Sequence, residues 1–183
     1  MDELIEKAKK GDKESFTKLI LEIKDDLYKI ARSRIYIETD IDDAVQETMI
    51  EAFKLIKKLK DNSKFKKWII KILINKCNRI YRRKYKKDVS IDEYNLENFA
   101  PTNDYKKIED ELNFYSLIKN LKYEERLIII LYYKENYSVK EIKEMLHIKE
   151  NMINTHLYRA RQKLRKILSN NQWRKDNLYM EEY

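Results

Sequence analysis

The sequence of 183 residues contains only one glycine, one proline and one cysteine. Tight β-hairpins need residues that tolerate positive φ, so the scarcity of glycine argues against a β-rich fold. Glycine and proline are also the residues that break helices, and their scarcity permits long ones. A lone Cys77 excludes an intramolecular disulfide and a cysteine-rich zinc site. Its apolar neighbours predict that it packs in a core.

Other features are missing as well. No apolar run approaches the ~18 residues that a bilayer-spanning helix needs, and no signal-peptide pattern opens the chain. The two histidines, His147 and His156, have no third ligand at a spacing suited to a metal. No constellation of catalytic residues is evident. We therefore expect a cytoplasmic protein that is not an enzyme and needs no cofactor or metal.

The formal net charge is +8, which weakly favours a polyanionic partner. The distribution of charge is more informative. Residues 38–51 hold six acids and no base, residues 64–87 hold eleven bases and no acid, and residues 88–111 hold eight acids and two bases. Segregation of this kind indicates separate surfaces with different partners.

Apolar residues at three- and four-residue spacing predict amphipathic helices over residues 1–60. A first helix around Leu4 and Ala8 ends at Gly11-Asp12, and a second follows. A third helix is predicted to begin near Asp40 or Asp42, because either can cap it and acids suit a helix N-terminus.

After the polar break Asp61-Asn62-Ser63, a fourth helix is predicted from about Phe65 to Tyr85. Phe65 and Trp68 lie on its apolar stripe, so core packing is the favoured role for both rings. The opposite face is almost wholly basic or polar.

Residues 88–110 lose this periodicity, are rich in acids and contain Pro101, which predicts a flexible domain linker. Two further helices are predicted near Glu111–Leu121 and Tyr123–Glu135. Residues 170–183 have no assignment.

A helix-turn-helix is predicted between Tyr137 and Lys166. Ser138-Val139-Lys140-Glu141 is a capping box, the pattern pauses at His147-Ile148-Lys149, and a second helix with a polar and basic face follows. Such a helix must fit a groove about 12 Å wide and donate to phosphates and base edges. An ordinary helical hairpin with a solvated charged face is the alternative, and the density of donors near the start of the second helix favours DNA binding.

Four stretches together resemble the extracytoplasmic-function (ECF) type of sigma factor, over roughly residues 3 to 168. Asp42–Phe53 (DDAVQETMIEAF) is similar to the segment that binds the polymerase clamp helices. Ser63–Ile72 (SKFKKWIIKI), with Asn75 after it, resembles the F-x-x-W-L-x-x-I motif. Tyr137–Ile142 (YSVKEI) and Ile153–Arg165 (INTHLYRARQKLR) resemble the two helices of the family's helix-turn-helix.

The resemblance implies an all-α fold of two small helical domains joined by an acidic linker. Residues 1–87 would form a region 2-like domain, residues 88–110 the linker, and residues 111–169 a region 4-like domain. The implied partners are core RNA polymerase, through the clamp helices of its largest subunit and through its flap, and promoter DNA in double- and single-stranded form. An anti-sigma factor is a further candidate partner.

The same resemblance assigns roles to residues. Core polymerase binding falls to Asp43, Gln46, Glu47, Met49 and Ile50. Contact with the melted −10 element falls to Lys60, Asp61, Asn62, Ser63, Lys64, Phe65, Asn75, Arg79, Arg82 and Arg83. Contact with the −35 element falls to Ser138, Asn154, Thr155, Tyr158, Arg159 and Arg161. The chemistry agrees, because cations track a single strand while a loop encloses one unstacked base.

The chain departs from the family pattern mainly in the helix-turn-helix. His147 stands where the family usually has glycine, which predicts strain if this residue adopts the left-handed conformation. Lys149-Glu150-Asn151-Met152 replaces a stretch with an evident N-cap, and Asn154 replaces a usual Lys or Arg. At the polymerase-binding helix, Thr48-Met49 replaces a usual aromatic. Two alternatives remain, a stand-alone helix-turn-helix regulator that binds DNA as a dimer and a helical adaptor without DNA.

Overall fold

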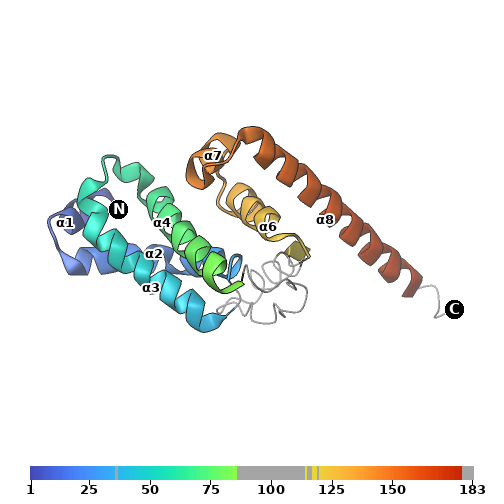
Figure 1. Cartoon of the computed structure of the whole chain (residues 1–183), viewed down its shortest axis with the longest axis horizontal. Helices are drawn as coiled ribbons and strands as arrows, with labels where there is room; N and C mark the ends of the chain where they lie inside the picture. Colours follow the sequence, from blue (N-terminus) through green and yellow to red (C-terminus); the bar gives the residue numbers. More distant parts are fainter. Residues whose placement is uncertain (36, 86–113, 115–116, 119, 179–183) are drawn as a thin grey trace. The chain divides into compact units, whose positions relative to one another are not determined.

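The computed structural model describes residues 1–35, 37–85, 114, 117–118 and 120–178, with the side chains of 85 and 170–178 outside the description. Every regular element in these segments is helical, as predicted (Figure 1). The chain divides into two compact units, Met1–Tyr94 and Asn95–Tyr183. The predicted linker 88–110, most of the predicted helix Glu111–Leu121 and residues 179–183 lie outside the described residues.

The described residues of unit 1 form four α-helices, in which α3 packs against both α4 and α2, and α1 packs against α2. Short single turns connect or extend them. The elements are α1 (Asp2–Lys9), α2 (Lys13–Arg32), α3 (Glu38–Leu55), η1 (Ile56–Lys58), η2 (Asn62–Lys64), α4 (Phe65–Ile80) and η3 (Tyr81–Tyr85). The core of the unit is made of their apolar stripes, with fully buried side chains that include Ile5, Leu19, Leu27, Ile30, Ile41, Ile56, Phe65, Ile69 and Leu73.

Cys77 belongs to this core, as the sequence predicted. The residue is fully buried, and burial raises the pKa of its thiol to about 12. A thiol with so high a pKa carries almost no thiolate near neutral pH, so it is chemically inert packing.

The connection between α1 and α2 lies where the sequence breaks its pattern. Gly11 adopts φ +98°, a conformation that glycine reaches without steric cost. Asp12 then caps α2, because its carboxylate accepts hydrogen bonds from the Glu14 backbone N–H at 3.1 Å and from the Ser15 hydroxyl at 2.6 Å.

The predicted start of the third helix was wrong by two residues or more. α3 begins at Glu38, with Ile37, which has no polar side chain, at the cap. Both predicted caps serve tertiary contacts instead. Asp40 lies in the first turn, is almost fully buried and pairs with Lys84 of η3, while Asp42 accepts a hydrogen bond from the Tyr28 hydroxyl at 2.9 Å.

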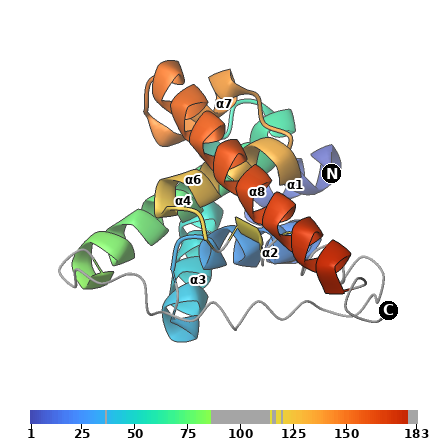
Figure 2. The ribbon, with the colours of Figure 1, turned by 90° about the vertical axis from the view of Figure 1, so that its right-hand side faces the viewer.

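Unit 2 contains α6 (Tyr123–Ile129), extended by the π-turn η5 (Ile130–Lys134), then α7 (Val139–Leu146) and α8 (Glu150–Leu178). α6 packs against α8, and α7 lies beside α8 (Figures 1 and 2). The predicted helix over Tyr123–Glu135 is confirmed. The core of the unit is formed by Ile118, Leu121, Leu127, Ile128, Ile129, Ile130, Leu131, Ile142, Met145, Ile153, Leu157 and Ala160.

A buried carboxylate ties two helices of unit 2 together. Glu125 on α6 is 2% exposed, accepts a hydrogen bond from the Lys122 backbone N–H at 3.0 Å and pairs with Lys163 of α8 at 2.7 Å. Removing one member of such a pair leaves a buried charge unpaired. The contact therefore fixes α8 against α6.

Among the helices of the described segments, none is long and apolar enough to cross a bilayer.

Candidate nucleic-acid interface

The acidic helix α3 presents its predicted contact residues unevenly. Asp43 and Gln46 are exposed, and Ile50 has 56% of its surface exposed. Glu47 is half-buried, because it accepts from Arg79 of α4 and lies 3.5 Å from the ammonium of Lys76. The middle of this acidic face is therefore neutralised by bases of the neighbouring helix.

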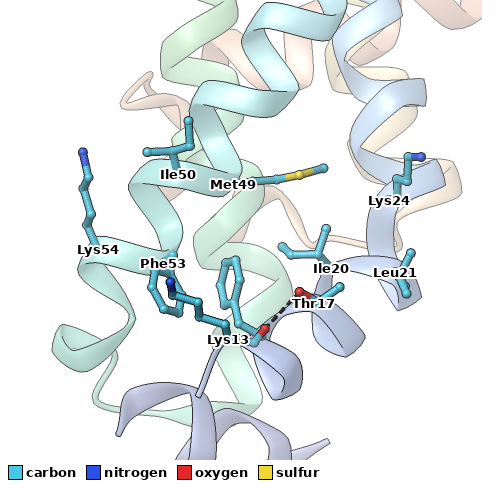
Figure 3. A pocket seen from close by; sticks show the side chains of 10 residues that line it. Lys13, Thr17, Ile20, Leu21, Lys24, Met49, Ile50, Phe53 and Lys54 are labelled. Carbon is cyan, nitrogen blue, oxygen red and sulfur yellow. Dashed lines mark hydrogen bonds between the residues drawn. The ribbon is translucent and has the colours of Figure 1, made fainter. Parts of the chain in front are cut away.

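Two of the predicted polymerase contacts, Met49 and Ile50, line an apolar groove between α2 and α3 (Figure 3). The groove has a volume of about 500 Å³. Its lining residues are Lys13, Phe16, Thr17, Ile20, Leu21 and Lys24 from α2 with Met49, Ile50, Phe53 and Lys54 from α3. An exposed apolar groove with a cationic rim suits the apolar face of a partner helix that has acids at its edges.

Within the groove, the rings of Phe16 and Phe53 pack edge to face with centroids 5.0 Å apart. Leu21 at one side is 65% exposed and Ile50 at the other is 56% exposed. Large apolar side chains at this exposure, on two helices that face one groove, leave apolar area that a partner can bury.

The predicted −10 loop is built around Asp61 and Asn62. The Asp61 carboxylate accepts from the Ser63 hydroxyl at 2.6 Å and from the Ser63 backbone N–H at 3.1 Å, and it pairs with Lys64 at 3.1 Å. The hydrogen bond from Ser63 and that from Lys64 lower the pKa of Asp61. The Asn62 amide is held by α1, since Lys9 donates to its oxygen at 2.7 Å and its nitrogen donates to Glu6 at 2.9 Å.

The structure corrects the prediction that Phe65, the last residue of that loop, contacts DNA. Its side chain has 0% exposure and packs in the core of unit 1, so it faces no DNA. The ring centroid of half-buried Trp68 lies 6.2 Å away. The apolar stripe had favoured core packing for both rings, and the structure confirms this for Phe65.

The basic face of α4 and η3 places Asn75, Arg79, Arg82 and Arg83 in solvent. Arg79 is 61% exposed even though it pairs with Glu47. The predicted helix from about Phe65 to Tyr85 is confirmed, since α4 covers Phe65–Ile80 and η3 continues it as a π-helical turn over Tyr81–Tyr85.

The helix-turn-helix forms with the predicted capping box. The Glu141 backbone N–H donates to the Ser138 hydroxyl at 3.3 Å, and the Ser138 backbone N–H donates to the Glu141 carboxylate at 2.9 Å. α7 ends at Leu146, and the capping residue His147 has φ +56° and ψ +39°, the left-handed conformation in which a side chain with a Cβ is strained. Lys143 and Glu150 bridge the turn with an ion pair of 2.9 Å.

The start of α8 separates its two faces as the sequence predicted. Ile153, Leu157 and Ala160 are buried. The predicted DNA contacts Asn154, Thr155, Tyr158 and Arg159 are exposed on the other side. The Thr155 hydroxyl donates to the Asn151 carbonyl at 2.7 Å, and the Ser138 hydroxyl donates to Glu141 at 2.8 Å.

Arg161 differs from the other predicted −35 contacts. It is half-buried, and its Nε donates to the Tyr133 hydroxyl at 2.8 Å. Its guanidinium lies 5.6 Å from the centroid of the Tyr132 ring and 5.7 Å from that of Tyr133. The side chain therefore joins α8 to η5.

Sequence reasoning missed the residues that support these surfaces from a distance. They include Glu6 and Lys9, which contact the loop, and Tyr133, which holds Arg161. Arg34, buried in unit 1, donates to Asn78 on α4. Their partners lie far away in the sequence, so no local pattern marks them.

Residues 19–87 match the family model for sigma-70 region 2, and residues 111–164 match that for sigma-70 region 4. The chain belongs to the sigma-70 family. It is 28% identical over 178 residues to the ECF RNA polymerase sigma factor SigW of Bacillus subtilis. The alignment covers 90% of this chain and 94% of the relative. It is 29% identical over 155 residues to the RNA polymerase sigma factor SigV of the same organism, covering 84% and 91%.

Solved structures agree on the fold. A chain in the complex of CnrH with the cytosolic domain of CnrY has a TM-score of 0.63 at 24% identity and covers 91% of this chain and 96% of its own length. A chain in the complex of the sigma factor RpoE with the anti-sigma factor NepR from Bartonella quintana has a TM-score of 0.67 at 22% identity, covering 84% and 96%.

The region 2 match lies in unit 1, with the acidic helix and the loop, and the region 4 match lies in unit 2, with the helix-turn-helix. Sigma-70 family members bind core RNA polymerase and promoter DNA, and they initiate transcription without being enzymes themselves. A stand-alone helix-turn-helix regulator would leave residues 19–87 unexplained, so that alternative is set aside.

Proposed function

We propose that this sigma-70 family member is an ECF-type initiation factor whose region 2 captures a melted −10 element and whose region 4 reads the −35 element. The observation that carries the proposal is the presence of both regions in one chain, each with an exposed polar and basic face. In region 2 that face holds Asn75, Arg82 and Arg83, and in region 4 it holds Asn154, Tyr158 and Arg159.

Core polymerase would dock on α3. Exposed Asp43 and Gln46 provide a polar contact, and acids steer association with a basic partner more than they add affinity. The groove beside Met49 and Ile50 adds apolar area that docking would bury. The partner surface is the pair of clamp helices of the largest subunit, with the flap as the contact for region 4.

In this proposal the factor opens the promoter by binding melted DNA more tightly than duplex DNA, and no chemical reaction is involved. Flipping a base out of the duplex costs a few kcal/mol, and a loop that encloses the unstacked base returns part of that cost. The loop Lys60–Lys64 with Asn75 would hold the base, and Arg79, Arg82 and Arg83 would neutralise the backbone next to it.

Reading of the −35 element would fall to the first turns of α8, which would enter the major groove as helix-turn-helix recognition helices do. Asn154 stands at an exposed position where the family usually has a cation. Because the asparagine amide pairs bidentately with adenine, we expect a preference for adenine at the base that it meets. Arg159 would contact a guanine or a phosphate.

The domain boundaries in this proposal are residues 1–87 for region 2, 88–110 for the linker and 111–169 for region 4. The site of action is the cytoplasm, where core polymerase works. An anti-sigma factor is included as a candidate partner, because the RpoE chain of similar fold was solved bound to the anti-sigma factor NepR.

The deciding experiment is transcription in vitro with core polymerase and a library of genomic promoter fragments. We expect transcripts from a small set of promoters that share −10 and −35 sequences. Arg159→Ala should weaken initiation through loss of a −35 contact, and Asn75→Ala should reduce opening on promoters that are still bound. Sequence-specific DNA binding that needs no polymerase would contradict the proposal.

A further inference from the structure

The side-chain amide of Asn62 is occupied at both ends by residues of α1. The Lys9 ammonium donates to Asn62 Oδ1 at 2.7 Å, and Asn62 Nδ2 donates to Glu6 Oε1 at 2.9 Å. Lys9 also pairs with Glu6 at 2.9 Å, so three side chains form a closed ring of charge-assisted hydrogen bonds.

The chemistry of these partners fixes the orientation of the amide. An ammonium group only donates and a carboxylate only accepts, so the oxygen of Asn62 must face Lys9 and the nitrogen must face Glu6. The amide oxygen and the amide nitrogen, which asparagine would offer to a base edge, each already make a hydrogen bond within the protein.

A second pair on the same helix shows that this arrangement is not generic. Lys7 and Glu3 form an ion pair of 2.7 Å, but their side chains are 55% and 81% exposed and the pair stays within α1. The Lys9 side chain is only 19% exposed. Hydrogen bonds from Lys9 and then Asn62 lower the pKa of Glu6, in agreement with a carboxylate that accepts from both.

Asn62 lies at the turn in the middle of the loop. It begins η2, directly after Asp61, whose side chain closes the turn, and three residues before Phe65, which is fully buried. α1 packs against η1, which precedes the loop, and against η2, which forms its second half. The matched region 2 segment begins at residue 19, so α1 lies outside it.

We propose that Glu6 and Lys9 are positioning residues for the loop Lys60–Lys64, and that Asn62 anchors this loop to α1 instead of reading a base. The inference rests on the proposed function, which assigns the loop to the −10 element. Contact with the captured base then falls to other members of the loop, among them the exposed residues Lys60, Ser63 and Lys64.

The test changes which side chains donate and which accept in the ring of hydrogen bonds formed by Glu6, Lys9 and Asn62. Asn62→Asp keeps an acceptor for Lys9 but sets a carboxylate against the carboxylate of Glu6, which should disturb the loop. Adding Glu6→Gln supplies a donor amide that can bond to the new carboxylate and restores the ring. A base contact of Asn62 would be lost in both variants alike, because Glu6 has no part in it.

The full-length chain with core polymerase is assayed by permanganate reactivity of −10 thymines, by transcript yield and by base preference on a −10 library. We expect N62D to reduce opening about fivefold and E6Q/N62D to recover to within about twofold of the unsubstituted chain. The −10 preference of the double variant should be unchanged. Polymerase affinity should be the same throughout, and the surface variant E3Q is the matched control.

Three results would overturn the inference. N62D could show no opening defect, the defect could persist in E6Q/N62D, or the double variant could open promoters with an altered −10 preference. If the unsubstituted chain gave no promoter-specific transcripts, the proposed function itself would fail, and this inference with it. The two failures are therefore distinguished before any variant is compared.

Discussion

Arg79 of α4 donates to the carboxylate of Glu47 of α3, so a residue predicted to face DNA holds one predicted to face polymerase. The pair lies at the surface, with 61% and 45% of the two side chains exposed. Exposed pairs contribute about 0–1 kcal/mol and exchange partners readily. Under the proposed function, polymerase would engage Glu47 and release Arg79 to a DNA backbone, so the two binding events would share one carboxylate.

The first prediction follows from this shared carboxylate. Glu47→Gln should raise the affinity of the free chain for single-stranded DNA by about two- to fivefold at low salt, because Arg79 is no longer paired. The gain should shrink as salt screens the charges. Fluorescence anisotropy over a salt series measures it, and Glu14→Gln, which removes a pair within α2, is the control. Equal gains in both variants would show a general effect of net charge.

Polymerase docking at the groove gives a second prediction. Ile50→Glu should lower affinity for core polymerase by at least about tenfold, because it sets a charge in apolar area that docking buries. Ile50 is already 56% exposed, so the melting temperature of the free chain should hardly change. Biolayer interferometry with core polymerase, beside circular dichroism, separates the two effects. Unchanged affinity would place the docking surface elsewhere.

A third prediction concerns the buried ring of Phe65. Phe65→Ala should lower the free energy of unfolding of unit 1 by about 3–5 kcal/mol, since it empties a fully buried aromatic site. Phe65→Leu should cost markedly less. Urea denaturation followed by Trp68 fluorescence measures both. A small effect of the alanine variant, together with a loss of DNA binding, would return Phe65 to the interface.

A fourth prediction concerns the turn of the helix-turn-helix. His147→Gly should stabilise unit 2 by about 1 kcal/mol, because glycine adopts the left-handed conformation without a Cβ penalty. His147→Ala keeps the Cβ and should leave stability nearly unchanged. Thermal unfolding of the three proteins checks this order. A loss of stability in both variants relative to the unsubstituted chain would mean that the imidazole itself stabilises the turn.

Two arginines two residues apart on α8 should behave differently. Arg161→Ala should destabilise unit 2 by about 1 kcal/mol through loss of the Tyr133 hydrogen bond and the stacking on Tyr132 and Tyr133. Arg159→Ala should leave stability unchanged and reduce binding of a −35 duplex, with a shallower salt dependence if its partner is a phosphate. Denaturation and anisotropy on both variants test this. A stable R161A variant with weaker DNA binding would restore Arg161 to the interface.

Local signals predicted most of the helices. Apolar periodicity located α2 and the stripe of α3, and the capping box of Ser138 and Glu141 placed the start of α7, because the atoms involved lie within a few residues of one another. The start of α3 was missed for the opposite reason. Asp40 has the chemistry of a cap, but its partner Lys84 is 44 residues away and only the tertiary fold brings them together.

The residues of the candidate site also fall into two groups, those whose exposure local sequence patterns predict and those whose contacts depend on the tertiary fold. Exposure of Asn154, Tyr158 and Arg159 follows from helical spacing, since Ile153, Leu157 and Ala160 must face inward. The engagement of Asn62 by Glu6 and Lys9, and that of Arg161 by Tyr133, depends on how separate helices pack. Sequence reasoning can nominate such polar residues for an interface, but it cannot tell which of them the fold has already used.

The buried carboxylate of Glu125 constrains how region 4 can be re-engineered. It accepts the hydrogen bond at the start of α6 and at the same time pairs with Lys163 on α8, the proposed recognition helix. A chimera that replaced α8 with the recognition helix of another factor, without a cation at this position, would leave that charge stranded in the core. Promoter specificity can therefore be transplanted only if the graft carries its own Lys163 or if Glu125 is changed with it.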